Sequence, residues 1–393
     1  MNILMLCFEY PPLGGGGGIG VRQYAEAWAA KGHRVAVLTG GGEGLPAREA
    51  LHGVEIVRVP TLARRDRATA TTAAMLTYNL SGLLHVFAHL GRLREFDIVN
   101  THFSIPTGPL GWAASRLLGR PDVLTIIGGD IYDPTKRSSP HRSRLLRQVN
   151  AWIINAADRV VAISSDTKTR AERFYRIRAP IRVINYGFTP AAGSSDGEEP
   201  VELPEGDRFR LISVGRLVAR KGFDHLLRAM SRLPEDVELL LVGDGPLEPE
   251  LRALARAEGV EERVRFLGYR TREAIHALLR HADCYVLSSL HEGLGIVVQE
   301  AMDAGLPVVA TDNGGQVDLI RSRRNGLLVP PGDPVALAEA IRVVRDDPAL
   351  AETMRRNNLA DIRELHMESN CELYLDLFRE LLAPADARPS VAS

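Results

Sequence analysis

Short apolar runs alternate with amphipathic stretches along most of this chain. In the first half these runs fit buried strands, at residues 3–8, 34–39, 56–59, 98–100, 123–127 and 159–163. A glycine-rich turn after the first run leads into a predicted helix from Gly20 to Lys31. Strands separated by helices are typical of a parallel sheet that is covered on both faces.

The pattern restarts after a segment rich in Pro, Gly, Ser and acidic residues, which we interpret as a linker over 189–207. Six further strands are predicted, at 210–214, 238–242, 264–266, 284–287, 307–310 and 326–329. The predicted fold is therefore α/β, with two Rossmann-like domains, 1–188 and 208–369, that face each other across a cleft. A ligand is expected where the carboxyl ends of both sheets meet this cleft.

Length and composition fit a globular protein rather than a fibrous, disordered or membrane-spanning chain. The chain has 393 residues, of which 45% are hydrophobic and 25% charged. No apolar run reaches the roughly 18 residues of a membrane span, and no signal peptide is recognised, so we expect a cytoplasmic protein. Cys7, Cys284 and Cys371 lie far apart in the sequence, which supports neither a disulfide framework nor a metal site.

The charge is divided unequally between the two halves. Residues 1–190 contain 24 Lys and Arg against 14 Asp and Glu, whereas residues 191–393 contain 24 against 35. Basic clusters occur at Arg64, Arg65 and Arg67 and again between residues 136 and 147. Two interpretations stay open: a solvated basic face, or contact with an anionic membrane or acceptor. Nucleic acid is not favoured, because the clusters lack interleaved aromatic residues and match no groove-reading motif.

The richest motif lies in the second half, at residues 291–311. Glu292 follows a predicted strand, Gly293 and Gly295 let the backbone approach a ligand, and a helix then carries Glu300. The open amino end of this helix, at Gly293, Leu294, Gly295 and Ile296, is suited to a pyrophosphate. The two carboxylates would accept hydrogen bonds from sugar hydroxyls. The alternative is two solvated glutamates on a surface helix.

Basic residues follow the first strand of the second domain. Gly215 and Arg216 come directly after it, and Lys221 lies five residues further on. Two cations at the mouth of a strand would neutralise a diphosphate leaving group. Glycine turns after the next strands, at Gly243 and Gly268, would bring more backbone near the ligand, or they are purely structural.

The first half offers fewer candidates. Gly16 and Gly17 belong to a run of five glycines, which would place backbone amides near phosphates or the acceptor. The second strand ends without the acidic residue of a dinucleotide-binding fold, which disfavours a dehydrogenase. His102 and Asp130 each follow a strand. Asp130 would either hold the His102 imidazole or a substrate hydroxyl, or cap its own turn.

These motifs together resemble the retaining glycosyltransferases of family 4, which have the GT-B fold. The resemblance covers nearly the whole chain. It is most specific at Glu292 and Glu300, which have seven residues between them. It implies a nucleoside diphosphate sugar as the donor and no cofactor. The roles that it implies are diphosphate binding by Arg216 and Lys221 and by the backbone after Gly293, sugar binding by Glu292, ribose binding by Glu300, and His102 near the reacting sugar.

The same resemblance implies that the last helix, in residues 370–393, crosses back toward the first domain. Two departures from the family pattern occur. The chain has Ile127 where the family often has a histidine before Gly-x-Asp, and Tyr186-Gly-Phe-Thr189 where Asn-Gly-Val-Asp is usual.

The leading prediction is a metal-independent, retaining transfer of a hexose-type sugar from a UDP- or GDP-linked donor to an acceptor hydroxyl. The product would be a glycan, a glycolipid or a glycosylated metabolite, and the acceptor is unidentified, with a lipid-linked one compatible with the basic first domain. One alternative is a sugar-nucleotide epimerase or hydrolase of the same architecture. Another is a non-catalytic subunit that binds sugar nucleotides or glycans.

Overall fold

The structure, a computed structural model, describes residues 1–62, 71–190 and 207–384. The basic cluster Arg64, Arg65 and Arg67 and most of the predicted linker lie outside these ranges. By their contacts the residues form two compact units, the first comprising 1–132, 137–187 and the chain from 367 onward, the second 133–136 and 188–366. Residues 133–136 therefore belong to the second unit, although we expected them in the first.

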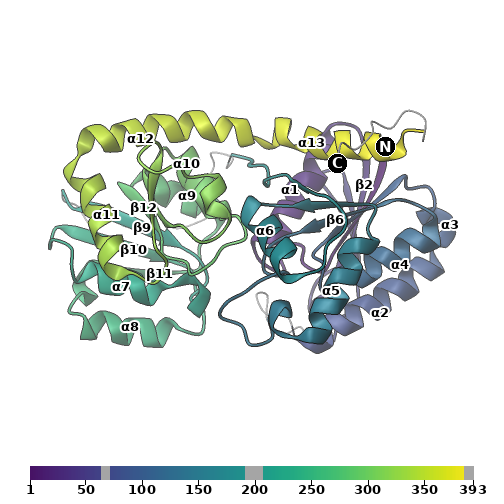
Figure 1. Ribbon diagram of the computed structural model, residues 1–393, viewed down its shortest axis with the longest axis horizontal. Coiled ribbons are helices and arrows are strands. Elements are labelled where there is room, and N and C mark those ends of the chain that lie inside the picture. The colour runs from purple at the N-terminus through teal and green to yellow at the C-terminus, as the bar shows by residue number, and fades with distance from the viewer. Residues whose placement is uncertain (63–70, 191–206, 385–393) are drawn as a thin grey trace. The chain divides into compact units, whose positions relative to one another are not determined.

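The first unit contains an eight-stranded sheet in the order β3-β4-β2-β1-β5-β6-β7-β8 (Figure 1). Its strands are β1 (Asn2–Cys7), β2 (Arg34–Gly40), β3 (Arg48–Leu51), β4 (Val54–Val59), β5 (Ile98–His102), β6 (Asp122–Ile126), β7 (Arg159–Ala162) and β8 (Ile181–Val183). All neighbours pair in parallel except β3 and β4, which are antiparallel. Both strands that we did not predict, β3 and β8, lie at the edges, where residues are exposed and apolar runs are short.

Helices flank this sheet. They are α1 (Gly16–Ala30), α2 (Thr72–Ala88), α3 (Leu90–Leu93), α4 (Gly108–Leu118), α5 (Arg144–Ala156), α6 (Ser165–Phe174) and the last helix of the chain, α13 (Met367–Leu382). Helix α13 packs on α1 within the first unit, and the Trp28 indole donates to the Cys371 carbonyl at 3.2 Å. Aromatic rings from both helices, among them Tyr24 and Tyr374 at 4.9 Å between centroids, fill this contact.

Helix α1 begins four residues earlier than we expected. The run Gly16–Gly18 is part of its first turn rather than of a loop. The expectation failed because we took a run of glycines to prevent helix formation. The first turn of this helix nevertheless contains glycine, and at some of these positions neighbouring groups leave no room for a side chain. A Cβ at Gly17 would come within 2.8 Å of the Phe103 ring.

The second unit contains a six-stranded parallel sheet in the order β11-β10-β9-β12-β13-β14. Its strands are β9 (Phe209–Val214), β10 (Val237–Val242), β11 (Val264–Gly268), β12 (Cys284–Leu287), β13 (Val308–Thr311) and β14 (Gly326–Val329), all six of which we predicted. Its helices are α7 (Phe223–Met230), α8 (Glu248–Ala257), α9 (Arg272–Arg280), α10 (Ile296–Asp303), α11 (Pro334–Asp346) and α12 (Pro348–Asp361). In the described ranges of both units, no helix combines the length and the apolar character that a bilayer crossing requires.

Both sheets share one order of strands. The six strands of the second sheet and the central six of the first, numbered along the chain within each set, lie in the spatial order 3-2-1-4-5-6. This is the order of a dinucleotide-binding α/β fold. The order in which strands are added to the sheet reverses between the first and fourth strands, which are the parallel neighbours β1 and β5 in the first unit and β9 and β12 in the second. In this class of fold the loops after these two strands diverge to opposite faces of the sheet. Ligands generally bind between such loops, at the carboxyl ends of the strands. The predicted fold class of two Rossmann-like domains is thus confirmed.

Candidate active site

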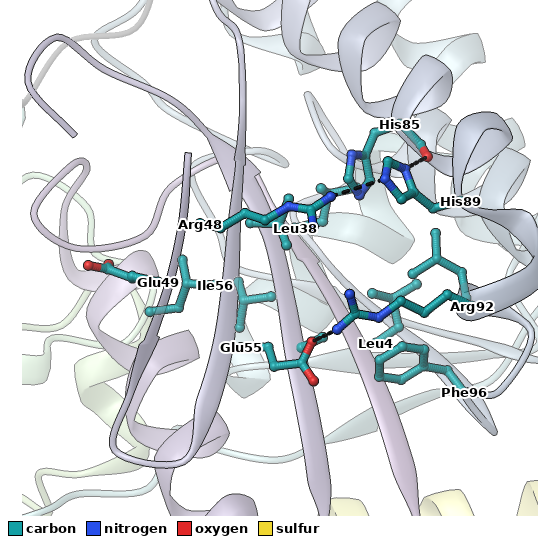
Figure 2. Close-up of a pocket in the computed structure, with 14 residues that line it drawn as sticks. Leu4, Leu38, Arg48, Glu49, Glu55, Ile56, His85, His89, Arg92 and Phe96 are labelled. Atoms are coloured by element: carbon teal, nitrogen blue, oxygen red, sulfur yellow. Dashed lines mark hydrogen bonds and ion pairs between the residues drawn. The ribbon is translucent and has the colours of Figure 1, made fainter. Parts of the chain in front are cut away.

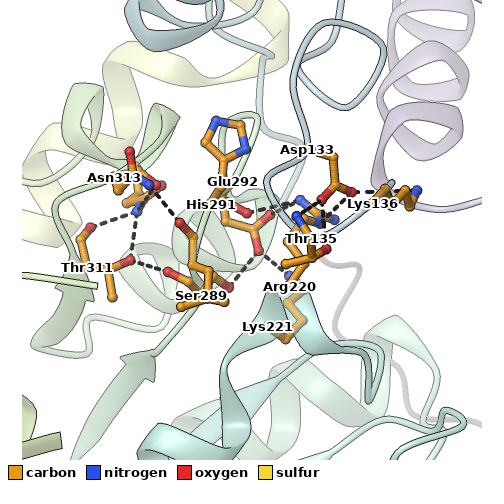
Figure 3. Close-up of polar contacts among 12 residues, drawn as sticks. Asp133, Thr135, Lys136, Arg220, Lys221, Ser289, His291, Glu292, Thr311 and Asn313 are labelled. Atoms are coloured by element: carbon orange, nitrogen blue, oxygen red, sulfur yellow. Dashed lines mark hydrogen bonds and ion pairs between the residues drawn. The ribbon is translucent and has the colours of Figure 1, made fainter. Parts of the chain in front are cut away.

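The predicted residues of the second unit gather at the carboxyl ends of β9 and β12. Glu292 lies on the loop between β12 and α10, and the residue is 6% exposed. Lys221 follows β9 and donates from Nζ to Glu292 Oε1 at 2.6 Å, while the Ser289 hydroxyl donates to the same oxygen at 2.7 Å. Figure 3 shows these side chains pointing toward one another. The structure therefore brings together a cation and a carboxylate that are 71 residues apart in the sequence.

A second cation, which we did not predict, joins this cluster. Arg220 donates from one guanidinium nitrogen to Glu292 Oε2 at 3.4 Å and to the His291 carbonyl at 3.1 Å (Figure 3). The sequence offered a signal, because Arg220 directly precedes Lys221, but neighbouring residues of a loop usually point in different directions. Here residues 219–221 form a single 3-10 turn, which brings both side chains to the same carboxylate.

The charges around Glu292 determine its ionisation. Burial by itself would raise the pKa of this carboxyl, but Lys221 and Arg220, with hydrogen bonds from Lys221 and Ser289, lower it to about 2. Glu292 is consequently ionised at neutral pH. Asp133 also lies 3.9 Å from Arg220 and is itself paired with Lys136 at 3.6 Å. The three cations and two carboxylates of this group leave one positive charge in excess, which suits an anion.

Close backbone contacts hold Glu292 in place. Gly315 donates from its backbone nitrogen to the Glu292 carbonyl at 3.0 Å. Gly314 has φ +135°, and a Cβ there would lie 2.5 Å from the same carbonyl oxygen. Only glycine fits at this position, so Gly314 is a positioning residue that we did not predict.

The predicted glycines near β9 serve a similar purpose. Gly215 leaves room for the Lys221 side chain, whose Cε would be 2.9 Å from an added Cβ. Gly243, at φ +129°, packs on Gly215 and donates to the Gly268 carbonyl at 2.8 Å. These glycines thus have a structural role in shaping the strand ends. Arg216 lies at the same end, two residues beyond β9, and is partly buried.

Helix α10 begins where the sequence indicated. Gly295 is its N-cap in a left-handed conformation, at φ +92°, and Ile296 is its first residue. Gly293 and Leu294 precede the helix, and the Leu294 side chain is buried. The first backbone N–H groups of such a helix have no partner within it and are available to an anion.

Glu300 lies on α10 and pairs with a cation from another helix. The Arg272 Nε donates to Glu300 Oε1 at 3.0 Å. Burial raises the pKa of the Glu300 carboxyl, an effect that Arg272 partly opposes. Arg272 also donates to the Thr189 carbonyl, so it fixes both the carboxylate and the start of the second unit. We did not predict this residue, because a lone arginine at a helix start has no distinctive signature.

The predicted residues of the first unit are buried and do not contact each other as expected. His102 ends β5 and is fully buried. Its Nε2 donates to Asn100 Oδ1 at 2.7 Å, and its Nδ1 accepts from the Tyr186 hydroxyl at 3.1 Å. Burial lowers the pKa of His102 to about 3, so the ring is neutral at physiological pH.

Of the alternatives for Asp130, a bond to His102 is therefore wrong, since both nitrogens of the imidazole have other partners. A bond from Asp130 to a substrate hydroxyl stays a prediction. Asp130 instead accepts from the Ser104 backbone at 2.7 Å and from the Ile127 backbone at 2.9 Å. This is the turn-capping alternative. Burial raises the pKa of Asp130 despite these bonds. The Tyr186 partner of His102 belongs to the segment that departs from the family pattern.

Gly16 and Gly17 occupy the first turn of α1. This helix follows β1, the strand beside which the strand order of the sheet reverses. The backbone nitrogens of both glycines have no partner further back in the helix, so the predicted use of these amides remains compatible with the structure. Gly15 donates from its backbone nitrogen to the Glu9 carboxylate at 3.0 Å. The Glu9 carboxylate, when ionised, would repel an anion bound at this turn.

A separate cavity of about 280 Å³ opens in the first unit. Leu4, Leu38 and Phe96 line its floor, and charged groups surround it (Figure 2). Arg92 forms an ion pair with Glu55 at 2.7 Å, and Arg48 donates a hydrogen bond to His89 Nε2 at 3.0 Å. All predicted site residues lie elsewhere in the described part of the chain, so the cavity is not part of the candidate site.

Both halves of the chain match models of known protein families. The family model for glycosyl transferases group 1 matches residues 195–360, and that for the glycosyl transferase 4-like domain matches residues 15–187. The chain is 30% identical over 373 residues to a glycogen synthase of Mycobacterium tuberculosis, covering 91% of this chain and 89% of the relative.

Two solved structures are similar over nearly the whole chain. The sucrose-phosphate synthase of Thermosynechococcus elongatus superimposes with a TM-score of 0.82 at 26% identity, covering 97% of this chain and 99% of the other. HepE of Anabaena, solved with UDP-glucose, has a TM-score of 0.75 at 23% identity and covers 97% and 100%. With its two dinucleotide-binding-type sheets and matches to both family models, the chain belongs to the glycosyltransferases of the GT-B fold.

Proposed function

We propose that this glycosyltransferase moves a hexose-type sugar from a UDP- or GDP-linked donor to an acceptor hydroxyl, with net retention at the anomeric carbon and without a metal ion. The observation that carries the proposal is the cluster of Lys221, Arg220 and Glu292 beside the open amino end of α10. This cluster supplies positive charge and backbone donors where a diphosphate would develop charge as it leaves.

In the proposed reaction the bond between the anomeric carbon and the diphosphate oxygen breaks, and a bond from that carbon to the acceptor oxygen forms. The acceptor proton passes to the departing diphosphate, and the cations of the second unit stabilise the negative charge on it. Glu292, ionised throughout the physiological range, accepts hydrogen bonds from the sugar and keeps Lys221 in position. Glu300 would bind the ribose.

His102 is assigned to positioning rather than to proton transfer. Its burial and its two hydrogen bonds leave the imidazole neutral and without a free nitrogen for a substrate proton. Asp130 is likewise a positioning residue, because it holds the turns after β5 and β6 through Ser104 and Ile127.

The names of the relatives support transfer of a sugar but differ in the product. A glycogen synthase and a sucrose-phosphate synthase are named for unlike products, one a polysaccharide and the other a sugar phosphate ester. The acceptor of this chain is therefore proposed only as a hydroxyl compound, in glycan, glycolipid or metabolite glycosylation.

The donor is identified by thermal unfolding with a panel of UDP, GDP and ADP sugars. A true donor at 100 times its dissociation constant adds about 2.7 kcal/mol to the free energy of unfolding. Incubation of that donor without acceptor distinguishes the alternatives: rapid conversion of the free donor favours an epimerase or hydrolase. Binding without turnover on any acceptor favours a non-catalytic subunit.

Substitution then tests the site. Lys221→Ala should lower kcat by about 100- to 1,000-fold, by comparison with the loss of one donor from an oxyanion hole. Lys168→Ala is the matched control, because Lys168 is a partly exposed lysine of the first unit in an i,i+4 pair with Glu172 at 4.0 Å. Turnover by Lys221→Ala at the wild-type rate would refute the assignment. The configuration of the product, determined by NMR, tests retention.

A further inference from the structure

Helix α2 exposes a continuous apolar stripe. Leu76, Leu80, Leu84 and Phe87 are between 52% and 67% exposed, and spacings of four, four and three residues place them on one face of the helix. The opposite face, with Ala74, Tyr78, Gly82 and Val86, is buried against the sheet and α4. The stripe is thus a second apolar face on a helix that already has one packed against the core.

The neighbouring helices extend this surface. Helix α4 packs between α2 and α5 in the first unit (Figure 1). Trp112 of α4 and Trp152 of α5 are 38% and 48% exposed, and their rings meet edge to face at 5.0 Å between centroids. Leu145 at the start of α5 is 67% exposed. Isolated apolar residues are ordinary on a protein surface, but seven large ones on three adjacent helices indicate an interaction site.

The charged residues of these helices are all basic. No residue of α2, α4 or α5 is Asp or Glu, while Arg116 lies on α4 and Arg144 and Arg147 on α5. Helix α13 of the same unit differs, since it carries Glu368, Glu372, Asp376 and Glu380. The absence of acidic residues from three adjacent helices distinguishes this surface from a generally solvated one.

We propose that the exposed faces of α2, α4 and α5, the apolar-cationic face, bind the surface of a membrane that contains anionic lipid. The leucines and Phe87 would enter the acyl boundary, and the two tryptophans would lie at the level of the headgroups, where indole rings are favoured. Each arginine near an anionic leaflet contributes about 1 kcal/mol, and no carboxylate on these helices opposes it. A contact of this kind between two copies of the chain would bring six arginines together.

This inference goes beyond the proposed transfer reaction and does not depend on it. Membrane binding is measured without donor or acceptor, so its failure and the failure of the proposed function are distinguishable.

The full-length protein is tested by co-sedimentation with vesicles of phosphatidylcholine alone and of phosphatidylcholine mixed with phosphatidylglycerol. We expect binding to the mixed vesicles that weakens as salt is added. The double variant Arg144→Gln/Arg147→Gln should lower the partition coefficient about 30-fold, as the loss of two such contacts implies. Leu80→Asp/Leu84→Asp should lose binding to the mixed vesicles.

Matched controls come from the second unit. Leu359→Asp on α12 replaces a leucine that is 41% exposed, and Arg356→Gln removes an exposed arginine. Both should bind like the wild type, and thermal unfolding checks that every variant folds. Tryptophan emission gives a second measurement: Trp112 and Trp152 should shift to the blue on binding, while the buried Trp28 stays unchanged.

Three results would overturn the proposal: no binding of the wild type to anionic vesicles, equal binding of the leucine variants and the wild type, or equal binding of the control and face variants. Light scattering tests whether a second copy of the chain, rather than a membrane, covers the apolar-cationic face. A dimer that Leu80→Asp/Leu84→Asp abolishes, in a protein that does not bind vesicles, would assign the face to a second copy of the chain.

Discussion

The two units build their candidate sites at equivalent places from opposite chemistry. Each site lies at the carboxyl ends of the first and fourth strands of a sheet with the same strand order. In the first unit, burial keeps His102 neutral and raises the pKa of Asp130. In the second unit, Lys221 and Arg220 keep the buried Glu292 ionised, with a pKa of about 2.

This contrast follows from the presence of partners rather than from depth of burial. An uncharged partner, such as Tyr186 beside His102, cannot offset the loss of water, so the neutral form wins. Two cations beside Glu292 outweigh the same loss. One fold therefore offers a site of neutral hydrogen-bonding groups and a site of fixed charge, which suits an uncharged acceptor in one and an anionic donor in the other.

The largest expected effect comes from removing the charge of Glu292. Glu292→Gln would leave Lys221 and Arg220 partly buried without their carboxylate, and we expect the second unit to lose about 3 kcal/mol of stability. Since the folded pKa is below the ordinary value, Glu292 stabilises the wild type above about pH 4.5, and this stabilisation disappears as pH falls toward 2.

The two units are followed separately in this experiment, because all three tryptophans (Trp28, Trp112 and Trp152) lie in the first unit. Urea unfolding should shift in circular dichroism more than in tryptophan emission. Glu352→Gln, at an exposed glutamate of α12, is the control and should change stability by less than about 0.5 kcal/mol. An unchanged midpoint for Glu292→Gln would contradict the assigned charge pair.

The opposite sign is expected in the first unit at Asp122. Burial is the main cause that raises the pKa of this carboxyl to about 7, although Thr101 donates to it at 2.6 Å. The raised pKa means that the wild type loses stability as pH rises from about 4 to 7. Asp122→Asn should therefore stabilise the first unit by about 2 kcal/mol at pH 8 and make little difference at pH 4.

Tryptophan emission during urea unfolding measures this change. Asp376→Asn is the control, because Asp376 is an exposed aspartate on α13 of the same unit. Destabilisation by Asp122→Asn at pH 8 would mean that the ionised carboxylate is favourable there, and the proposed contrast between the units would not hold.

A smaller effect is expected at Arg220. Its contact with Glu292 is longer than that of Lys221, at 3.4 Å against 2.6 Å, and its side chain is more exposed. We expect Arg220→Ala to cost about 1 kcal/mol. It should also raise the pKa of Glu292 and move acid unfolding, followed by circular dichroism, to higher pH. Arg220→Lys keeps the charge and should restore part of the loss; identical acid unfolding in all three proteins would exclude the proposed coupling.

The smallest effect concerns the pH dependence of catalysis. If His102 is a neutral positioning residue with a pKa of about 3, its ionisation does not limit kcat/KM between about pH 5 and pH 8. His102→Gln should lower the rate without changing the shape of the profile in this range. An acid limb near pH 6 in the wild type that disappears in His102→Gln would show instead that the imidazole acts in proton transfer.

Motifs with local signatures were predicted well. The strands of the second unit, the loop with Glu292, and the amino end of α10 at Gly295 and Ile296 all follow from apolar runs and glycines within a few residues of each other. Errors arose where the local rule had an exception. Helix α1 includes the glycines from Gly16 onward, and the edge strands β3 and β8 lack the apolar runs of buried strands.

The sequence by itself determined the alternation of strands and helices, the two-domain fold and the residue types of the site, because periodicity and strand-end motifs are local properties. Only the tertiary structure decided which partners these residues have. Arg220 and Gly314 lie on other loops than Glu292, far from it in the sequence but beside it in the fold. Tyr186 likewise contacts His102, which is 84 residues away in the sequence. Partners determine whether a buried group is charged or neutral, and contacts between distant segments leave no spacing in the chain from which they could be predicted.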